Sequence, residues 1–151
     1  GYEGDLGVEI VAMNGEDYYG ASGERLFLEE NEGRMGEIVL GVNIDGIAYR
    51  EAEDAYSLYN CPDDLAASVR AACAPYAGLV EGDPWYAGDH GLFLMSGVPA
   101  VAFTSAGVGA LLAEYTHTPR DTVELVDPRR VVTVARALRD LIERLAATSG
   151  A

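Results

Sequence analysis

Four residues of the sequence combine metal-binding side chains with positions at the ends of apolar runs. Glu16 and Asp17 follow the run VEIVAM, Asp45 ends the run EIVLGVNID, and His117 lies in the loop EYTHTPRDT, which comes after the run VPAVAFTS. Carboxylates and imidazole are ligands that zinc and similar divalent metals accept. A carboxylate beside a metal can also act as a general base toward metal-bound water. The set is therefore suited to metal-assisted hydrolysis.

The adjacent residues Glu16 and Asp17 could have two different roles in one site. Adjacent residues at a turn after a strand can point in different directions into one site, so one acid would hold a metal and its neighbour would accept a proton from water. Taken singly, each signal is weak: the pair also fits a solvated turn, Asp45 in NIDG fits turn chemistry, and His117 fits an exposed loop. Their joint position at one predicted sheet edge favours a site.

Three further residues flank the run VPAVAFTS. Asp89 and His90 come just before it, and Asp121 follows His117 in the loop after it. The chain has two histidines, and both flank this run. His90 in GDHGLF equally fits a residue at a helix start with local hydrogen bonds, and Asp121 equally fits a residue that only orders its loop. We expect these three to support the site.

The scaffold that must position these residues is predicted to be α/β. Apolar runs rich in Val and Ile alternate with helical patterns, which argues for a mostly parallel sheet covered on both faces in one domain over residues 1–151. Ligands bind beyond the carboxyl ends of such strands. We expect strands over residues 7–14, 37–45, 55–60 and 98–105, and helices over residues 22–32, 61–76, 88–97 and 128–150.

Two helix patterns are specific enough to assign faces. The terminal helix should begin with Asp127 as N-cap and Pro128 at its first position. Its buried stripe should consist of residues at three- and four-residue steps: Val131, Val134, Leu138, Leu141 and Leu145. In the first helix, the inward positions should be Leu26, Phe27 and Leu28.

Composition narrows the classes of partner. The chain has 151 residues and a formal net charge of −15 at pH 7, which disfavours nucleic acid and anionic membrane as partners. No apolar run is long enough to cross a bilayer, and the composition is compatible with either a cytoplasmic or a secreted location. The two cysteines, Cys61 and Cys73, have no metal-binding spacing, so we expect buried thiols.

Several segments together resemble a known family. VEIVAMNGEDYYGASGE, GVNIDGIAY, AGDHGLFLMSGVPAVAFTS and YTHTPRDTVELVDP resemble, in this order, the zinc-dependent aminopeptidases that include bacterial leucyl aminopeptidases and glutaminyl cyclases. The resemblance extends from about Val8 to the terminal helix. It implies a three-layer α/β sandwich around a mixed sheet, two zinc ions, and hydrolysis of the amino-terminal residue of a peptide by metal-activated water.

The resemblance also implies a role for each candidate. By position, Glu16 matches the general base of the family, Asp17 a metal ligand that is usually Glu, Asp45 the aspartate ligand of the other metal, and His117 the last histidine ligand. The supporting residues would be Asp89, His90 and Asp121.

The sequence departs from the family in one segment. The family takes a further histidine ligand and a bridging aspartate from a His-x-Asp motif upstream of the strand that here begins near Gly7, and this chain has no histidine before His90. We therefore expect the C-terminal part of such a domain, with an incomplete metal site and little activity alone. We also expect self-association through the surface left open. The alternatives are a non-catalytic binding module, which the short Asp17 side chain would suit, and a glutaminyl cyclase.

Overall fold

The architecture is a mixed β-sheet with helices on both faces. The computed structural model describes residues 4, 6–15 and 21–149. Within that part of the chain, a four-stranded sheet has the order β1-β4-β2-β3. β4 pairs parallel with β1 and antiparallel with β2, and β2 pairs parallel with β3. The strands are β1 (Gly41–Ile44), β2 (Asp54–Tyr59), β3 (Leu79–Glu81) and β4 (Ala100–Ser105). The predicted α/β class and mixed sheet are confirmed.

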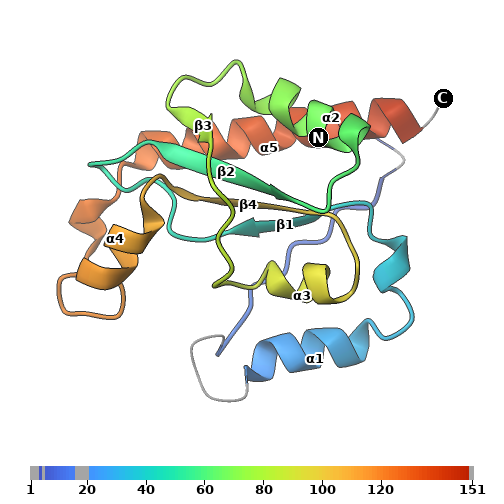
Figure 1. Cartoon of the computed structure of the whole chain (residues 1–151), viewed down its shortest axis with the longest axis horizontal. Helices are drawn as coiled ribbons and strands as arrows, with labels where there is room; N and C mark the ends of the chain where they lie inside the picture. The colour runs from blue at the N-terminus through green and yellow to red at the C-terminus, as the bar shows by residue number, and fades with distance from the viewer. Residues whose placement is uncertain (1–3, 5, 16–20, 150–151) are drawn as a thin grey trace.

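The helices form layers on either side of this sheet. Figure 1 shows α2 and α5 on one face, α1 and α3 on the other, and α4 beside one end of the sheet. The α-helices are α1 (Ser22–Glu30), α2 (Asp63–Cys73), α3 (Gly91–Met95), α4 (Val108–Glu114) and α5 (Pro128–Ser149). Two short 3-10 helices, η1 (Met35–Glu37) and η2 (Val123–Leu125), complete the described elements. No helix among these residues is both long and apolar enough to cross a membrane.

The central strand β4 has different side chains on its two faces. Val101 and Phe103 pack in the larger core, between the sheet and the helices α2 and α5. Ala100 and Ala102 face the opposite side, where Phe93 of α3 packs against them. Small residues there let α3 approach closely. At Gly41 of the neighbouring strand, an added Cβ would overlap the ring of Phe93, so a larger residue would displace α3.

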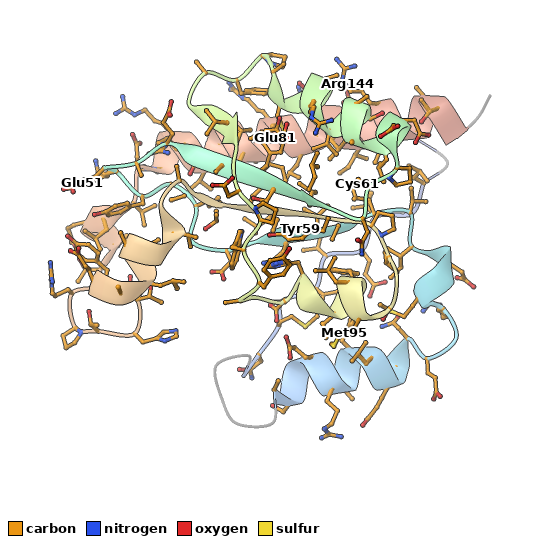
Figure 2. The ribbon with its side chains drawn as sticks, in the orientation of Figure 1. Glu51, Tyr59, Cys61, Glu81, Met95 and Arg144 are labelled. Carbon is orange, nitrogen blue, oxygen red and sulfur yellow. The ribbon has the colours of Figure 1, made fainter. Side chains whose placement is uncertain are left out.

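The terminal helix begins as predicted. The side chain of Asp127 accepts a hydrogen bond from the backbone N–H of Arg129 at 3.0 Å, and the helix starts at Pro128. Val134 and Leu141 are buried on its inner face, but Val131 is 41% exposed, so the predicted stripe is one turn too long at its start. Figure 2 shows Tyr59 in the interior of the molecule, whereas Glu51 lies at its periphery.

The strand predicted over residues 7–14 is wrong for the structure described. These residues have no strand conformation, and Ile10 is 93% exposed. An apolar run becomes a strand only when another strand takes up its backbone hydrogen bonds, and none of the described strands does so. Asn14 instead accepts a hydrogen bond from Gly23 at 3.0 Å. Leu26, predicted to face inward, is 55% exposed, because α1 packs chiefly through Phe27 against Phe93.

Candidate functional site

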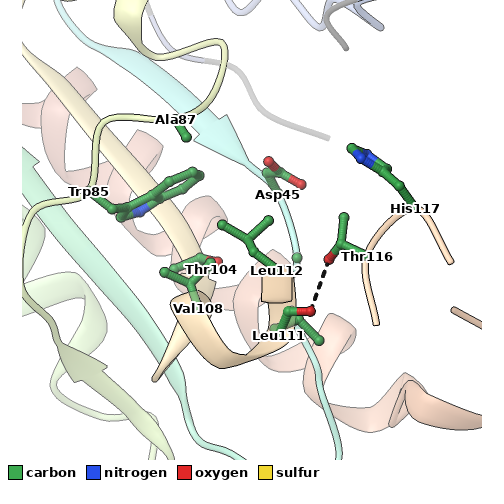
Figure 3. Close-up of a pocket in the computed structure, with 10 residues that line it drawn as sticks. Asp45, Trp85, Ala87, Thr104, Val108, Leu111, Leu112, Thr116 and His117 are labelled. Atoms are coloured by element: carbon green, nitrogen blue, oxygen red, sulfur yellow. Dashed lines mark hydrogen bonds between the residues drawn. The ribbon is translucent and has the colours of Figure 1, made fainter. Parts of the chain in front are cut away.

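A pocket of about 150 Å³ lies beyond the carboxyl ends of β1 and β4. Its walls come from the turn after β1, the end of β4, helix α4 and two loops (Figure 3). Parallel neighbouring strands end at the same sheet edge, which places their following residues together. The lining residues are Asp45, Gly46, Trp85, Ala87, Thr104, Val108, Leu111, Leu112, Thr116 and His117.

Asp45 and His117 reach this pocket from separate parts of the chain. Asp45 directly follows β1, and its backbone N–H donates to the carbonyl of Phe103 at 3.0 Å, which continues the β1–β4 pairing by one residue. Gly46 then turns the chain with a positive φ of 68°, a conformation that favours glycine. His117 also has a positive φ, 61°. Figure 3 shows the two side chains on separate segments of the chain, among the residues that line the pocket.

Contacts between residues of the same loop stabilise the segment that carries His117. The Thr118 hydroxyl donates to the backbone carbonyl of Tyr115 at 2.6 Å, and the backbone N–H of Arg120 donates to the same hydroxyl at 3.2 Å. The Arg120 guanidinium lies 4.5 Å from the centre of the Tyr115 ring. Asp121, which we expected to order this loop, is exposed. Threonine hydroxyls commonly bond nearby backbone, so the Thr-Pro-Arg sequence was the available signal for Thr118.

His90 lies outside the pocket and supports one of its walls. Its side chain is fully buried, and Nε2 lies 2.8 Å from the carbonyl oxygen of Trp85. Nδ1 lies 3.3 Å from Nδ2 of Asn43 in β1. The ring also packs against Tyr59 and Trp85, at 4.8 and 4.7 Å between ring centres. Because both ring nitrogens have partners, His90 holds Trp85 in place and has no position for binding a metal.

Asp89 faces the first turn of α1. One of its carboxyl oxygens is buried without a hydrogen-bond partner in the described part of the chain. Partial burial, together with the nearby Asp89 carboxyl, raises the pKa of Glu24. Ionisation of both carboxyl groups at the same time is therefore unfavourable. Asp89, like His90, does not line the pocket, and the assignment of both as supporting residues stays a prediction.

The metal site can be assessed only in part. Glu16 and Asp17 lie outside the described residues. Among the residues that are described, no three or more His, Cys, Asp and Glu side chains form a group that could hold a metal. Asp45 and His117 are suitable zinc ligands by type, but zinc takes three or four protein ligands. The pair therefore fits as a part of a zinc site, and the ligand roles stay predictions.

Two buried polar atoms on the pocket residues were not foreseen from the sequence. Nε1 of Trp85 and the hydroxyl oxygen of Thr104 have no hydrogen-bond partner within the described structure. Thr104 is 3% exposed and lies on β4. A threonine in an apolar strand reads as an ordinary strand residue, because β-branched side chains are frequent there. Only the packing reveals that its hydroxyl faces a pocket.

Comparisons with known proteins agree with the fold described above. Residues 2–142 match the family described as Peptidase family M28. The fold matches the solved structure of an aminopeptidase from Aneurinibacillus sp. strain AM-1, with a TM-score of 0.67 and 20% sequence identity. The match covers 86% of this chain and 31% of that aminopeptidase, so the chain spans about a third of its length. No curated protein sequence matches the chain. The predicted family resemblance is confirmed.

Proposed function

The chain belongs to peptidase family M28, and we propose that it is the C-terminal part of a zinc-dependent exopeptidase that removes the amino-terminal residue of a peptide. Asp17, Asp45 and His117 would supply metal ligands, and Glu16 would be the general base. The observation that carries this proposal is the placement of Asp45 and His117 on one pocket. The peptide substrate and self-association also remain predictions.

Metal binding and proton transfer would be carried out by different residues of the chain. Asp45 and His117 would hold metal from two segments of the pocket lining, one the turn after β1 and the other the loop after α4. Zinc, when bound, would polarise the peptide carbonyl and lower the pKa of its water. Glu16 would accept a proton from the attacking water and return it to the leaving amine.

The isolated chain should hydrolyse peptides poorly. It offers Asp17 and His117 to one metal and Asp45 to the other, which is fewer than the three or four ligands that a zinc ion takes. Asp17 is also one methylene shorter than the Glu usual in the family, which limits its reach. A longer protein that adds a His-x-Asp segment upstream would complete both sites.

The test compares this chain with a longer version extended upstream. Zinc binding is measured by isothermal titration calorimetry, and hydrolysis by release of anilide from an aminoacyl-anilide. We expect the longer version to bind zinc at least tenfold more tightly than this chain. His117→Ala and Asp45→Asn should each weaken zinc binding by roughly 10- to 100-fold, whereas His90→Gln should leave the zinc affinity within a few-fold.

The base is tested separately from the ligands. Glu16→Gln in the longer version should retain zinc and lose hydrolysis by at least 100-fold, the lower end of what a general base contributes. Full activity in Glu16→Gln would overturn the assigned role. If the longer version neither binds zinc nor cleaves an anilide, the alternative is favoured: a binding module that keeps the fold without catalysis.

A further inference from the structure

The two partnerless polar atoms belong to Trp85 and Thr104, which line the same pocket as Asp45 and His117. Nε1 of Trp85 can only donate a hydrogen bond, and the hydroxyl of Thr104 can donate or accept one. Leaving such a group buried and unpaired is unfavourable, so native proteins seldom retain one without a reason. That two such groups occur on residues lining a single small pocket suggests that something else completes their hydrogen bonding.

Both residues are held firmly in their positions. The backbone N–H of Trp85 donates to the Tyr59 hydroxyl at 2.8 Å, and that hydroxyl donates to the Trp85 carbonyl at 2.6 Å. His90 also packs against the indole ring. Thr104 lies in the centre of the sheet, with its backbone paired opposite Ala55 of β2. Neither residue can readily turn toward another partner, so a bound group must come to them.

The hydroxyl of Thr104 is on the pocket side of its strand. A Cβ added at Gly46, which also lines the pocket, would lie 3.3 Å from this oxygen. The remaining walls near it are apolar, contributed by Val108, Leu111 and Leu112. An apolar protein cavity of about 150 Å³ is large enough to hold a molecule of the size of benzene. The pocket therefore admits a group of about six non-hydrogen atoms.

The chemistry of the lining restricts the type of group. A donor-only indole N–H requires an acceptor, which excludes an ammonium group. Asp45 at the opening and the net charge of −15 disfavour a carboxylate. A purely apolar group would leave both polar atoms unpaired. The group that fits is short and neutral and ends in a hydroxyl or an amide.

We propose that this pocket receives the side chain of the amino-terminal residue of the substrate, and that Thr104 and Trp85 select side chains ending in a neutral hydroxyl or amide. This rests on the proposed function, since Asp45 and His117 beside the pocket are assigned there to the reacting centre. Thr104 and Trp85 are thus specificity-determining residues.

Trp85 is the only tryptophan in the chain, so its fluorescence reports directly on the pocket. Threonine amide and valine amide, which differ by a hydroxyl in place of a methyl, are titrated into the 151-residue chain. We expect threonine amide to shift the emission and to bind roughly two- to tenfold more tightly, as one net hydrogen bond implies. Asparagine amide should likewise bind more tightly than leucine amide.

The matched variants isolate the hydroxyl. Thr104→Val should abolish the preference for threonine amide, and Thr104→Ser should keep it. Thr133→Val, a change on α5, which does not line the pocket, should leave the preference unaltered. Circular dichroism establishes that each variant is folded. Equal binding of the two amides, tighter binding of valine amide, or no emission change with either amide would overturn the proposal.

The longer protein separates this inference from the proposed function. Its hydrolysis of threonyl- and valyl-anilides is measured alongside the fluorescence titrations. A preference in fluorescence without any hydrolysis would leave the recognition intact and refute the peptidase assignment. Hydrolysis of both anilides with equal KM and kcat would support the peptidase assignment and overturn the selection by Thr104 and Trp85.

Discussion

The imidazole of His90 joins the sheet to the wall of the pocket through Trp85. A carbonyl oxygen only accepts, so Nε2 of His90 must carry the hydrogen that it donates to the Trp85 carbonyl at 2.8 Å. The neutral ring then accepts through Nδ1 from the side-chain amide of Asn43 in β1, at 3.3 Å. A fully buried, neutral histidine thus links a strand to the loop that positions the indole.

Replacing His90 should therefore loosen Trp85. His90→Ala removes a buried ring and leaves Asn43 and the Trp85 carbonyl without their partners, so we expect a loss of about 3 kcal/mol in the free energy of unfolding. Urea denaturation measures the loss, and a red shift of Trp85 emission should accompany it. His117→Ala, the same change at an exposed histidine, should alter stability by less than about 0.5 kcal/mol. Equal losses in both variants would contradict the structural role of His90.

Thr104→Val should stabilise the chain in the absence of ligand. Valine has nearly the same shape but lacks the hydroxyl that is buried without a partner, so the gain should be about 1 kcal/mol. The measurement is the urea midpoint at unchanged m-value. In the control Thr133→Val, the lost hydroxyl only bonds the Arg129 carbonyl of the same helix, and stability should change little. A destabilised Thr104→Val would mean that the hydroxyl has a partner.

A buried ion pair between β2 and α5 should matter more than a surface pair. Asp54 accepts from the backbone N–H of Ala48 at 2.6 Å and from Nε of Arg130 at 3.2 Å. Asp54→Ala leaves the partly buried Arg130 guanidinium without its carboxylate partner and the Ala48 N–H without its acceptor, which should cost about 3 kcal/mol. Glu81→Ala breaks an exposed pair with Arg70 at 2.7 Å and should cost less than about 1 kcal/mol. Chemical denaturation of the two variants side by side tests this ranking.

Glu24→Gln should improve stability at neutral pH more than at acid pH. Burial, with the Asp89 carboxyl beside it, raises the pKa of Glu24 above 4.5, so the folded chain holds this proton more tightly than the unfolded chain. Stability is therefore lost as the pH rises from about 4.5 through the raised pKa. The neutral amide removes that loss, and the gain should stay below about 1 kcal/mol because Glu24 is only partly buried.

Unfolding curves of wild type and Glu24→Gln at pH 4 and pH 7 provide the test. Glu30→Gln, on the same helix but exposed, should not reproduce a pH-dependent gain. A larger gain for Glu24→Gln at pH 4 than at pH 7 would refute the repulsion between Glu24 and Asp89.

Elements whose signals are local could be predicted from the amino-acid sequence. The buried strand ending at Ser105 and the helix beginning at Pro128 with its Asp127 cap form as expected, because strand propensity, capping and apolar periodicity act over a few neighbouring residues. The order of family segments also indicated the fold, and placed Asp45 and His117 as candidates for one site. Their roles, with those of Glu16 and Asp17, remain for the zinc and activity measurements.

Features that depend on partners distant in the chain emerged only from the packed structure. Residues 7–14 are as apolar as a strand but have no described neighbour to pair with, whereas the short strand β3 exists because β2 takes up its backbone hydrogen bonds. The burial of His90 and the unpaired hydroxyl of Thr104 likewise arise from what surrounds them. A residue's type sets which hydrogen bonds it can make, but packing alone decides which partners come within reach.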